Sequence, residues 1–182
     1  MKDLISLTCL LSLFFTLNVK TFAKVEAQNY NFSLDELALF APGQPLEKIK
    51  EKYKDIDVIK ESGEEQIIKI YVAQTRYKYP VYIQLKNKTS IGYYAKLPTY
   101  FLHDIFHQSL INRYGKQDTY KKQESEAIYI WKNANGNMIV YNGACTITCF
   151  PVYLSVMKKP KKEEAIKPLL QQFMNIDLFK KI

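Results

Sequence analysis

Two stretches of this sequence repeat one pattern, and the repeat decides the fold. In the first stretch, the amphipathic segment Pro45–Tyr53 (PLEKIKEKY) leads to Asp57 and then to Ile67–Tyr71 (IIKIY). In the second, Ile105–Tyr114 (IFHQSLINRY) leads to Asp118 and then to Ala127–Trp131 (AIYIW). Tyr53 aligns with Tyr114 and Asp57 with Asp118 at one common offset. The chain is therefore expected to contain two tandem copies of a module in which a helix precedes a sheet.

The apolar residues outside the repeat extend this expectation to the whole chain. Between 56 and 97 their period changes from helical to two, which is typical of antiparallel strands with one buried face. The predicted helices span 33–40, 45–54 and 100–114, and further strands are predicted at 118–122, 126–132, 138–142 and 150–157. We expect an α+β fold of two tandem helix-plus-antiparallel-sheet modules, 33–97 and 98–157, forming one domain (28–157) with its helices on one face of the sheet. Residues 158–182 should form a basic linker and an extra C-terminal amphipathic helix that begins at Pro168.

The N-terminus has the three-part plan of a secretory signal peptide. Lys2 precedes the apolar run Leu4–Leu17, which is shorter than the ~20 residues that span a bilayer. Val25-Glu26-Ala27 supplies small residues for cleavage, so residues 1–27 are predicted to be a signal peptide. An uncleaved membrane anchor is the alternative. The mature protein is expected to be secreted or periplasmic.

The charge disfavours nucleic acid as a partner. The formal net charge is +8, but Arg76 and Arg113 are the only arginines, and bidentate recognition of phosphates and bases favours arginine. A lysine excess fits a solvated surface or loose attraction to an anionic envelope. The run Lys158–Lys162 with the last helix could make peripheral contact with an anionic membrane, or it could be a solvated linker.

Two cysteines remain after signal-peptide cleavage, Cys145 and Cys149. In an oxidising compartment such a pair predicts a disulfide. In an extended strand these residues would be ~13 Å apart, too far for a bond, so either the segment folds back as a tight loop or the two thiols are free. Asn142-Gly143 just upstream favours that turn.

The two histidines of the chain, His103 and His107, lie four residues apart on a predicted helix. This spacing puts both imidazoles on one face, as metal binding requires, and His103-Asp104-Ile105-Phe106-His107 is similar to the zinc-protease motif. However, aspartate replaces the glutamate of that motif, and no third ligand follows at a recognisable spacing. The alternative is that both histidines pack against the core and form hydrogen bonds. No cofactor is predicted.

Aromatic residues give a second candidate site. If Ile68, Ile70, Ile128 and Ile130 face the helices, the other face of the sheet carries aromatic side chains among lysines. The set is Tyr71, Tyr82, Tyr94, Trp131, Tyr141 and Tyr153. Tyrosine and tryptophan with interspersed basic residues are typical of a protein-binding surface. Alternatively, these residues are ordinary strand formers or lie beneath the C-terminal helix.

The run Leu110-Ile111-Asn112-Arg113-Tyr114-Gly115-Lys116-Gln117-Asp118 followed by Ile128–Trp131 resembles the β-lactamase-inhibitor-protein-like module. Small outer-membrane-assembly lipoproteins of the SmpA/OmlA type use one such module, with proline where Gln117 stands here. The resemblance implies a scaffold of two modules over about residues 33–157. With no catalytic motif beyond the histidine pair, we expect an exported, non-catalytic protein that binds a protein or cell-envelope partner. The alternative is a metal-dependent hydrolase that uses His103 and His107.

Overall fold

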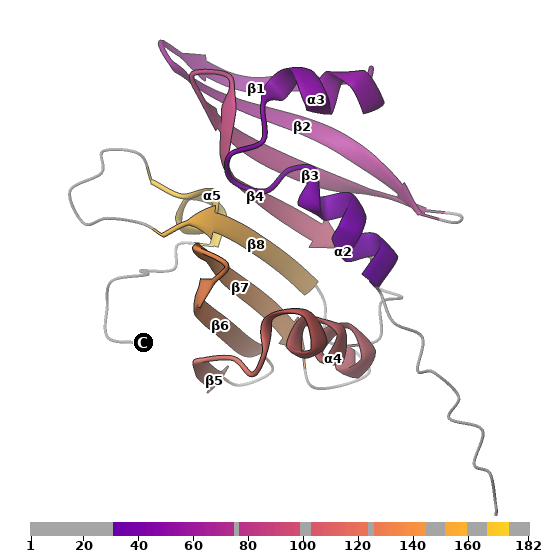
Figure 1. Cartoon of the computed structure of the whole chain (residues 1–182), viewed down its shortest axis with the longest axis vertical. Helices are drawn as coiled ribbons and strands as arrows, with labels where there is room; N and C mark the ends of the chain where they lie inside the picture. The colour runs from indigo at the N-terminus through magenta and orange to yellow at the C-terminus, as the bar shows by residue number, and fades with distance from the viewer. Residues whose placement is uncertain are drawn as a thin grey trace, which may run out of the picture.

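One antiparallel sheet of eight strands organises the chain (Figure 1). The structure is a computed structural model that describes residues 31–74, 77–98, 103–123, 126–144, 152–159 and 167–174. The strands are β1 (Asp57–Ser62), β2 (Glu65–Gln74), β3 (Tyr77–Lys86), β4 (Thr89–Leu97), β5 (Thr119–Gln123), β6 (Glu126–Ala134), β7 (Asn137–Ala144) and β8 (Val152–Lys158). The helices are α2 (Asn31–Ala38), α3 (Leu46–Lys52), α4 (His103–Tyr114) and α5 (Leu169–Met174). The α+β class follows from these elements.

The sheet order is β1-β2-β3-β4-β8-β7-β6-β5, and every neighbouring pair is antiparallel. Strands β1 to β4 follow one another as a meander, and so do β5 to β8. The two meanders meet where β4 pairs with β8, from Gly92 opposite Met157 to Leu97 opposite Val152. The alternating apolar pattern in the sequence therefore gave the strands, and their bounds differ from the predicted ones by one or two residues.

Helices α2, α3 and α4 cover one face of the sheet (Figure 1). Their apolar residues are spaced at helical intervals, so one side of each helix is apolar and packs on the sheet. Leu37 and Phe40 from the α2 region, Ile49 from α3 and Phe106 from α4 are completely buried in this core. Burial of this apolar surface stabilises the contact between helices and sheet.

The other face of the sheet is also covered in part. Leu169 and Leu170 of α5 pack there against Tyr94, Ile130 and Met157. Figure 1 shows α5 behind the region where β4 meets β8. Gln84 Nε2 donates to the Lys167 carbonyl at 3.1 Å and ties the start of this segment to β3. Helices α2, α3 and α4 thus lie on one face as predicted, and the extra C-terminal helix docks on the opposite face, which is the alternative that the sequence left open.

Backbone hydrogen bonds fix the position of α3. Gly43 N–H donates to the Ser90 carbonyl at 2.7 Å, and Leu46 N–H donates to the Lys88 carbonyl at 2.8 Å. The loop before α3 is thereby attached to the turn between β3 and β4. Helix α2 begins at Asn31, two residues before the predicted start at 33.

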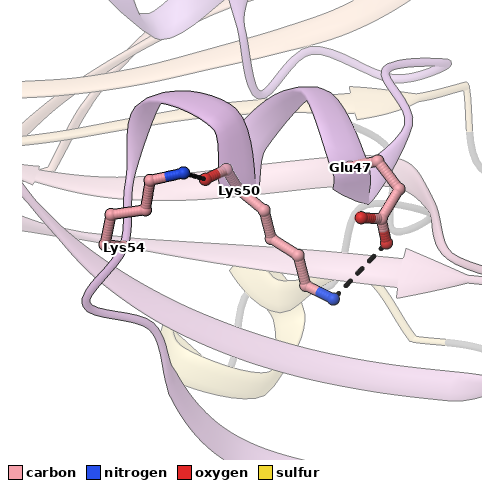
Figure 2. Close-up of polar contacts among 3 residues, drawn as sticks. All are labelled: Glu47, Lys50 and Lys54. Atoms are coloured by element: carbon pink, nitrogen blue, oxygen red, sulfur yellow. Dashed lines mark hydrogen bonds and ion pairs between the residues drawn. The ribbon is translucent and has the colours of Figure 1, made fainter.

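The C-terminal turn of α3 is basic (Figure 2). Lys50 Nζ lies 3.4 Å from Glu47 Oε1, and Lys54 Nζ donates to the Lys50 carbonyl at 3.0 Å (Figure 2). A cation at this position satisfies a terminal carbonyl and interacts favourably with the helix dipole.

Among the described residues, no helix is long and apolar enough to cross a membrane. The predicted signal peptide (1–27), Cys145, Cys149 and most of the 158–182 linker and tail lie outside the described residues.

Candidate functional site

The six aromatic residues predicted to share one exposed face lie in three different places. Trp131 and Tyr141 are buried on the helix-covered face. Tyr94 is buried on the opposite face, where half-buried Tyr82 and Tyr153 lie beside it. Tyr71 alone of the six is largely exposed, at 50%. The predicted common aromatic face was therefore wrong.

The error arose in β6. Both alternating sets of this strand are apolar, so the period of two could not show which set faces the helices. In the structure, Ala127, Tyr129 and Trp131 face α4, whereas Ile128 and Ile130 face the α5 side. On the α5 side, Phe173 contacts the rings of Tyr82 and Tyr94, with centroids 4.9 and 5.1 Å away. The last helix therefore covers much of the face that was expected to bind a partner.

His103 lies between two strand tyrosines. Its Nδ1 is 3.1 Å from the Tyr141 hydroxyl, and its Nε2 is 3.2 Å from the Tyr129 hydroxyl. Its ring stacks on that of Tyr141 with an interplanar angle of 9°. A neutral imidazole has one donor and one acceptor nitrogen, and each tyrosine hydroxyl can fill either role. Both ring nitrogens of His103 are therefore satisfied without a metal ion.

His107 lies one turn further along α4 and stacks on His103, with ring centroids 5.7 Å apart. Its ring also packs on Tyr129, with centroids 3.9 Å apart. The Gln117 side chain lies close enough to raise the pKa of His107, but its Oε1 and the His107 Nε2 are buried and make no hydrogen bond of good geometry. This pair is the least satisfied polar contact of the histidine cluster.

Burial lowers the pKa of both histidines below the usual value of 6.5. The charge on His103 would lower the pKa of His107 further, whereas Asp104 raises both values. Both imidazoles are therefore neutral at pH 7. Within the described ranges, no group of three or more histidine, cysteine, aspartate or glutamate side chains could hold a metal ion. The two histidines share one helix face as predicted, and that face packs on the tyrosines of β6 and β7.

A pocket of about 400 Å³ lies at the end of β2, on the other meander. Three tyrosines (Tyr53, Tyr71 and Tyr79), three charged side chains (Glu36, Lys52 and Lys78) and β2 residues Val72, Ala73 and Gln74 line it. Helix α2 contributes Glu36, the end of α3 contributes Lys52 and Tyr53, and β3 contributes Lys78 and Tyr79. The first meander thus has a pocket lined by tyrosines and charged side chains, whereas the second has a pair of half-buried histidines.

Hydrogen bonds hold the helical wall of this pocket. Glu36 accepts from Lys52 Nζ through Oε2 and from the Tyr53 hydroxyl through Oε1. Burial, and next the hydrogen bond to Glu36, raise the pKa of the Tyr53 hydroxyl, which therefore stays protonated. Next to the pocket residue Tyr71, Lys69 Nζ lies over the tyrosine ring and is 2.9 Å from Asp57 Oδ2. Lys78 is exposed and forms no ion pair with a described carboxylate.

No protein-family model, curated protein or solved structure matches the chain. The sequence patterns placed Tyr53 near the end of the predicted helix 45–54 and Tyr71 on a broad sheet face. They did not join either residue to Glu36, Lys52, Lys78 or Tyr79. The missing information was the packing of α2 and the end of α3 beside β2, which no local pattern shows.

Proposed function

We propose that this protein is an exported, non-catalytic binding protein that holds a segment of a partner protein of the cell envelope or secreted space. One observation carries the proposal: the pocket at the end of β2, with tyrosine and lysine side chains around it. Concave sites with aromatic walls and a few placed polar groups are typical of recognition surfaces. Tyrosines supply large contact area together with a hydroxyl group.

The distribution of exposed apolar side chains supports the same region. Four of the six large exposed hydrophobic residues of the described chain lie on β1, β2 and β3. They are Val58, Ile59, Tyr71 and Tyr77, each 50–57% exposed. Single exposed apolar side chains are normal on a surface, so the support for this region comes from Tyr71, which also lines the pocket.

The hydrolase alternative has less support. Its two candidate ligands face Tyr129 and Tyr141, and both nitrogens of His103 contact tyrosine hydroxyls. A metal ion there would have to displace these contacts. We therefore place recognition at the β2 pocket and assign packing to the histidine pair.

The binding site belongs to a scaffold that we infer to be a tandem of two modules, similar to the β-lactamase-inhibitor-protein-like architecture. Each four-strand meander follows a helix. Tyr53 and Tyr114 lie within one residue of the end of that helix, and Asp57 and Asp118 lie within one residue of the start of the first strand. In the part of the chain that the structure describes, the first copy has an additional helix, α2, which supplies Glu36. The pocket is thus a feature that the two copies do not share.

Selection of random displayed peptides on the purified protein tests the binding function. We expect peptides that bind the wild-type chain and lose about tenfold or more in affinity for Tyr71→Ala, as for a side chain that anchors an interface. Tyr120→Ala is the matched control, because Tyr120 is 49% exposed but lies on β5 at the far edge of the sheet. No enriched peptide, or equal binding to Tyr71→Ala, would contradict the proposal.

Export is tested separately. If residues 1–27 are a cleaved signal peptide, the protein recovered from the medium or the periplasm begins at Gln28 by mass spectrometry. An intact N-terminus on a membrane-associated protein would instead support the uncleaved anchor. The same spectrum, with and without reduction, measures whether Cys145 and Cys149 are joined.

A further inference from the structure

The end of β2 extends beyond the strand that pairs with its outer side. Strand β1 pairs with β2 from Glu65 to Lys69 only, whereas β3 pairs with β2 along its whole length to Gln74. Residues 70–74 therefore present one side that no described strand covers. This uncovered edge borders the pocket, since Tyr71, Val72, Ala73 and Gln74 all line it.

The register shows which backbone groups point outward. Ser62 and Glu65 flank the two-residue turn between β1 and β2, and residues that flank such a turn form a hydrogen-bonded pair. The N–H and C=O groups of Glu65 thus point toward β1, and alternation directs those of Tyr71 and Ala73 to the same side. Tyr71 and Pro80 then form a non-hydrogen-bonded pair of β2 and β3, and proline, which has no N–H, is compatible with such a pair. No described turn or loop backbone bonds to Tyr71 or Ala73 on the outer side.

We propose that the pocket receives an extended, acidic segment of another protein that adds as a strand to the β2 edge at Tyr71 and Ala73. The inference rests on the proposed function and names its ligand. Five strand residues present an edge of about 16 Å, enough for backbone pairing with a short peptide. Strand addition takes affinity from backbone hydrogen bonds and specificity from pockets for alternate side chains. Here the uncovered edge of β2 and the pocket lie next to each other.

Charge selects an acidic segment over a basic one. Lys52 and Lys69 are paired with Glu36 and Asp57, but Lys78 on the pocket wall has no carboxylate partner in the described part of the chain. The whole chain has a formal net charge of +8. An aspartate or glutamate beside Lys78 would complete its charge pairing, and the positive field would speed association. We therefore expect the displayed peptides that bind to be enriched in acidic residues.

The test uses synthetic copies of the most enriched displayed peptide with N-methyl groups on alternate backbone nitrogens. In a paired strand, alternate N–H groups point to the neighbour and the others to solvent. We expect one methylation pattern to weaken binding about tenfold or more and the complementary pattern to leave it unchanged. The amide protons of Tyr71 and Ala73 should become protected from exchange when the unmodified peptide binds.

The outcomes separate this inference from the proposed function. Peptides that depend on Tyr71 but tolerate both methylation patterns, or lose affinity with both, would overturn strand addition and leave pocket binding in place. A binding peptide without acidic residues, unaffected by Lys78→Gln, would overturn the charge assignment. Self-association of the purified protein that disappears in Ala73→Pro would make a second copy the occupant instead. Loss of all peptide binding would remove the proposed function itself.

Discussion

The imidazole of His103 lies directly against the backbone of Gly143. A Cβ atom added at Gly143 would be 2.2 Å from His103 Nδ1 and 2.8 Å from Tyr141 Cε1, both well inside van der Waals contact. Gly143 is on β7, opposite Ala127 of β6. The absence of a side chain there leaves the space in which His103 reaches the tyrosine hydroxyls.

Replacement of Gly143 by alanine should destabilise the fold. The added methyl group must displace His103, Tyr141 or the strand, so we expect the free energy of unfolding to fall by about 1–3 kcal/mol, as for overpacked cores. Urea unfolding measures the change. In a His103→Ala background the main clash is removed, so the cost of Gly143→Ala should shrink. An equal cost in both backgrounds would show that His103 is not the obstacle.

The histidine pair should make stability depend on pH. Burial lowers both folded-state pKa values below 6.5, so the unfolded chain binds more protons in the window between those values and 6.5. The free energy of unfolding should therefore be highest above that window and be lost as the pH falls through it. The test is denaturant unfolding from about pH 7.5 to about pH 5.5, where histidine is the main titrating side chain.

The double variant His103→Gln/His107→Gln supplies the control for this pH dependence, because glutamine does not titrate. Its stability should vary much less over the same range, whatever its absolute value. Trp131 gives an independent signal, since it is the only tryptophan and its ring centroid is 6.2 Å from that of His107. If the free energy of unfolding of the double variant changed with pH as steeply as that of the wild type, the pH dependence would belong to other groups.

Two hairpin turns allow lysine and glycine to be exchanged in opposite directions at the same turn position. Asn87 and Lys88 join β3 to β4 with φ of 49° and 57°, whereas Asn135 and Gly136 join β6 to β7 with φ of 52° and 83°. Lysine is strained at positive φ and glycine is not. Lys88→Gly should raise the free energy of unfolding by about 0.5–1 kcal/mol, the relieved strain outweighing the greater freedom of the unfolded chain.

Gly136→Lys is the matched opposite change and should lower the free energy of unfolding by about 1 kcal/mol. No atom lies within 4 Å of a Cβ built at Gly136, so the cost comes from the backbone conformation alone. Thermal or urea unfolding of both variants measures the pair of effects. Two changes of the same sign would contradict the assignment of strain to the turn conformation.

Local sequence signals were sufficient for the elements of this fold and insufficient for its surfaces. Helical spacing of Leu34, Leu37 and Ile49 and the alternation in β2 and β3 gave elements and their order, because these patterns depend only on neighbours in the chain. The prediction of which β6 side chains face the helices was wrong. Tyr129 and Trp131 are as able to enter an apolar core as Ile128 and Ile130, so the alternation did not distinguish the two sets. Only the docking of α4 and α5 on opposite faces decides between them.

The candidate site depends on contacts that are distant in sequence. Glu36 and Tyr53 meet because α2 and α3 both pack on the first meander, and Lys78 joins them through the β2–β3 pairing. The uncovered edge at Tyr71 and Ala73 results from the different lengths of β1 and β2. Strand ends are among the least accurate results of pattern analysis, so this edge was not visible from the sequence.

Helix α5 should detach without unfolding the sheet when Leu170 is replaced by aspartate. Leu170 is 1% exposed, and a carboxylate cannot remain in that apolar contact without a partner. The backbone pairing of the eight strands does not include this six-residue helix, so the cooperative transition of the sheet should persist. The free energy of unfolding should fall by about 1–3 kcal/mol, because the contacts of Leu169 and Leu170 with the sheet are lost. Binding of an apolar dye should increase, because Tyr82, Tyr94 and Tyr153 lose their cover.

Gln171→Asp is the control for this change, since it adds the same charge to the neighbouring, partly exposed position of the same helix. It should leave dye binding and stability almost unchanged, because a surface charge near a helix end contributes well under about 1 kcal/mol. Unfolding of the whole sheet by Leu170→Asp would mean that α5 is part of the cooperative core. Unchanged dye binding would mean that the tyrosines stay covered. Peptide binding at the β2 pocket should be the same in both variants, because the pocket is lined from α2, α3, β2 and β3 and not from α5.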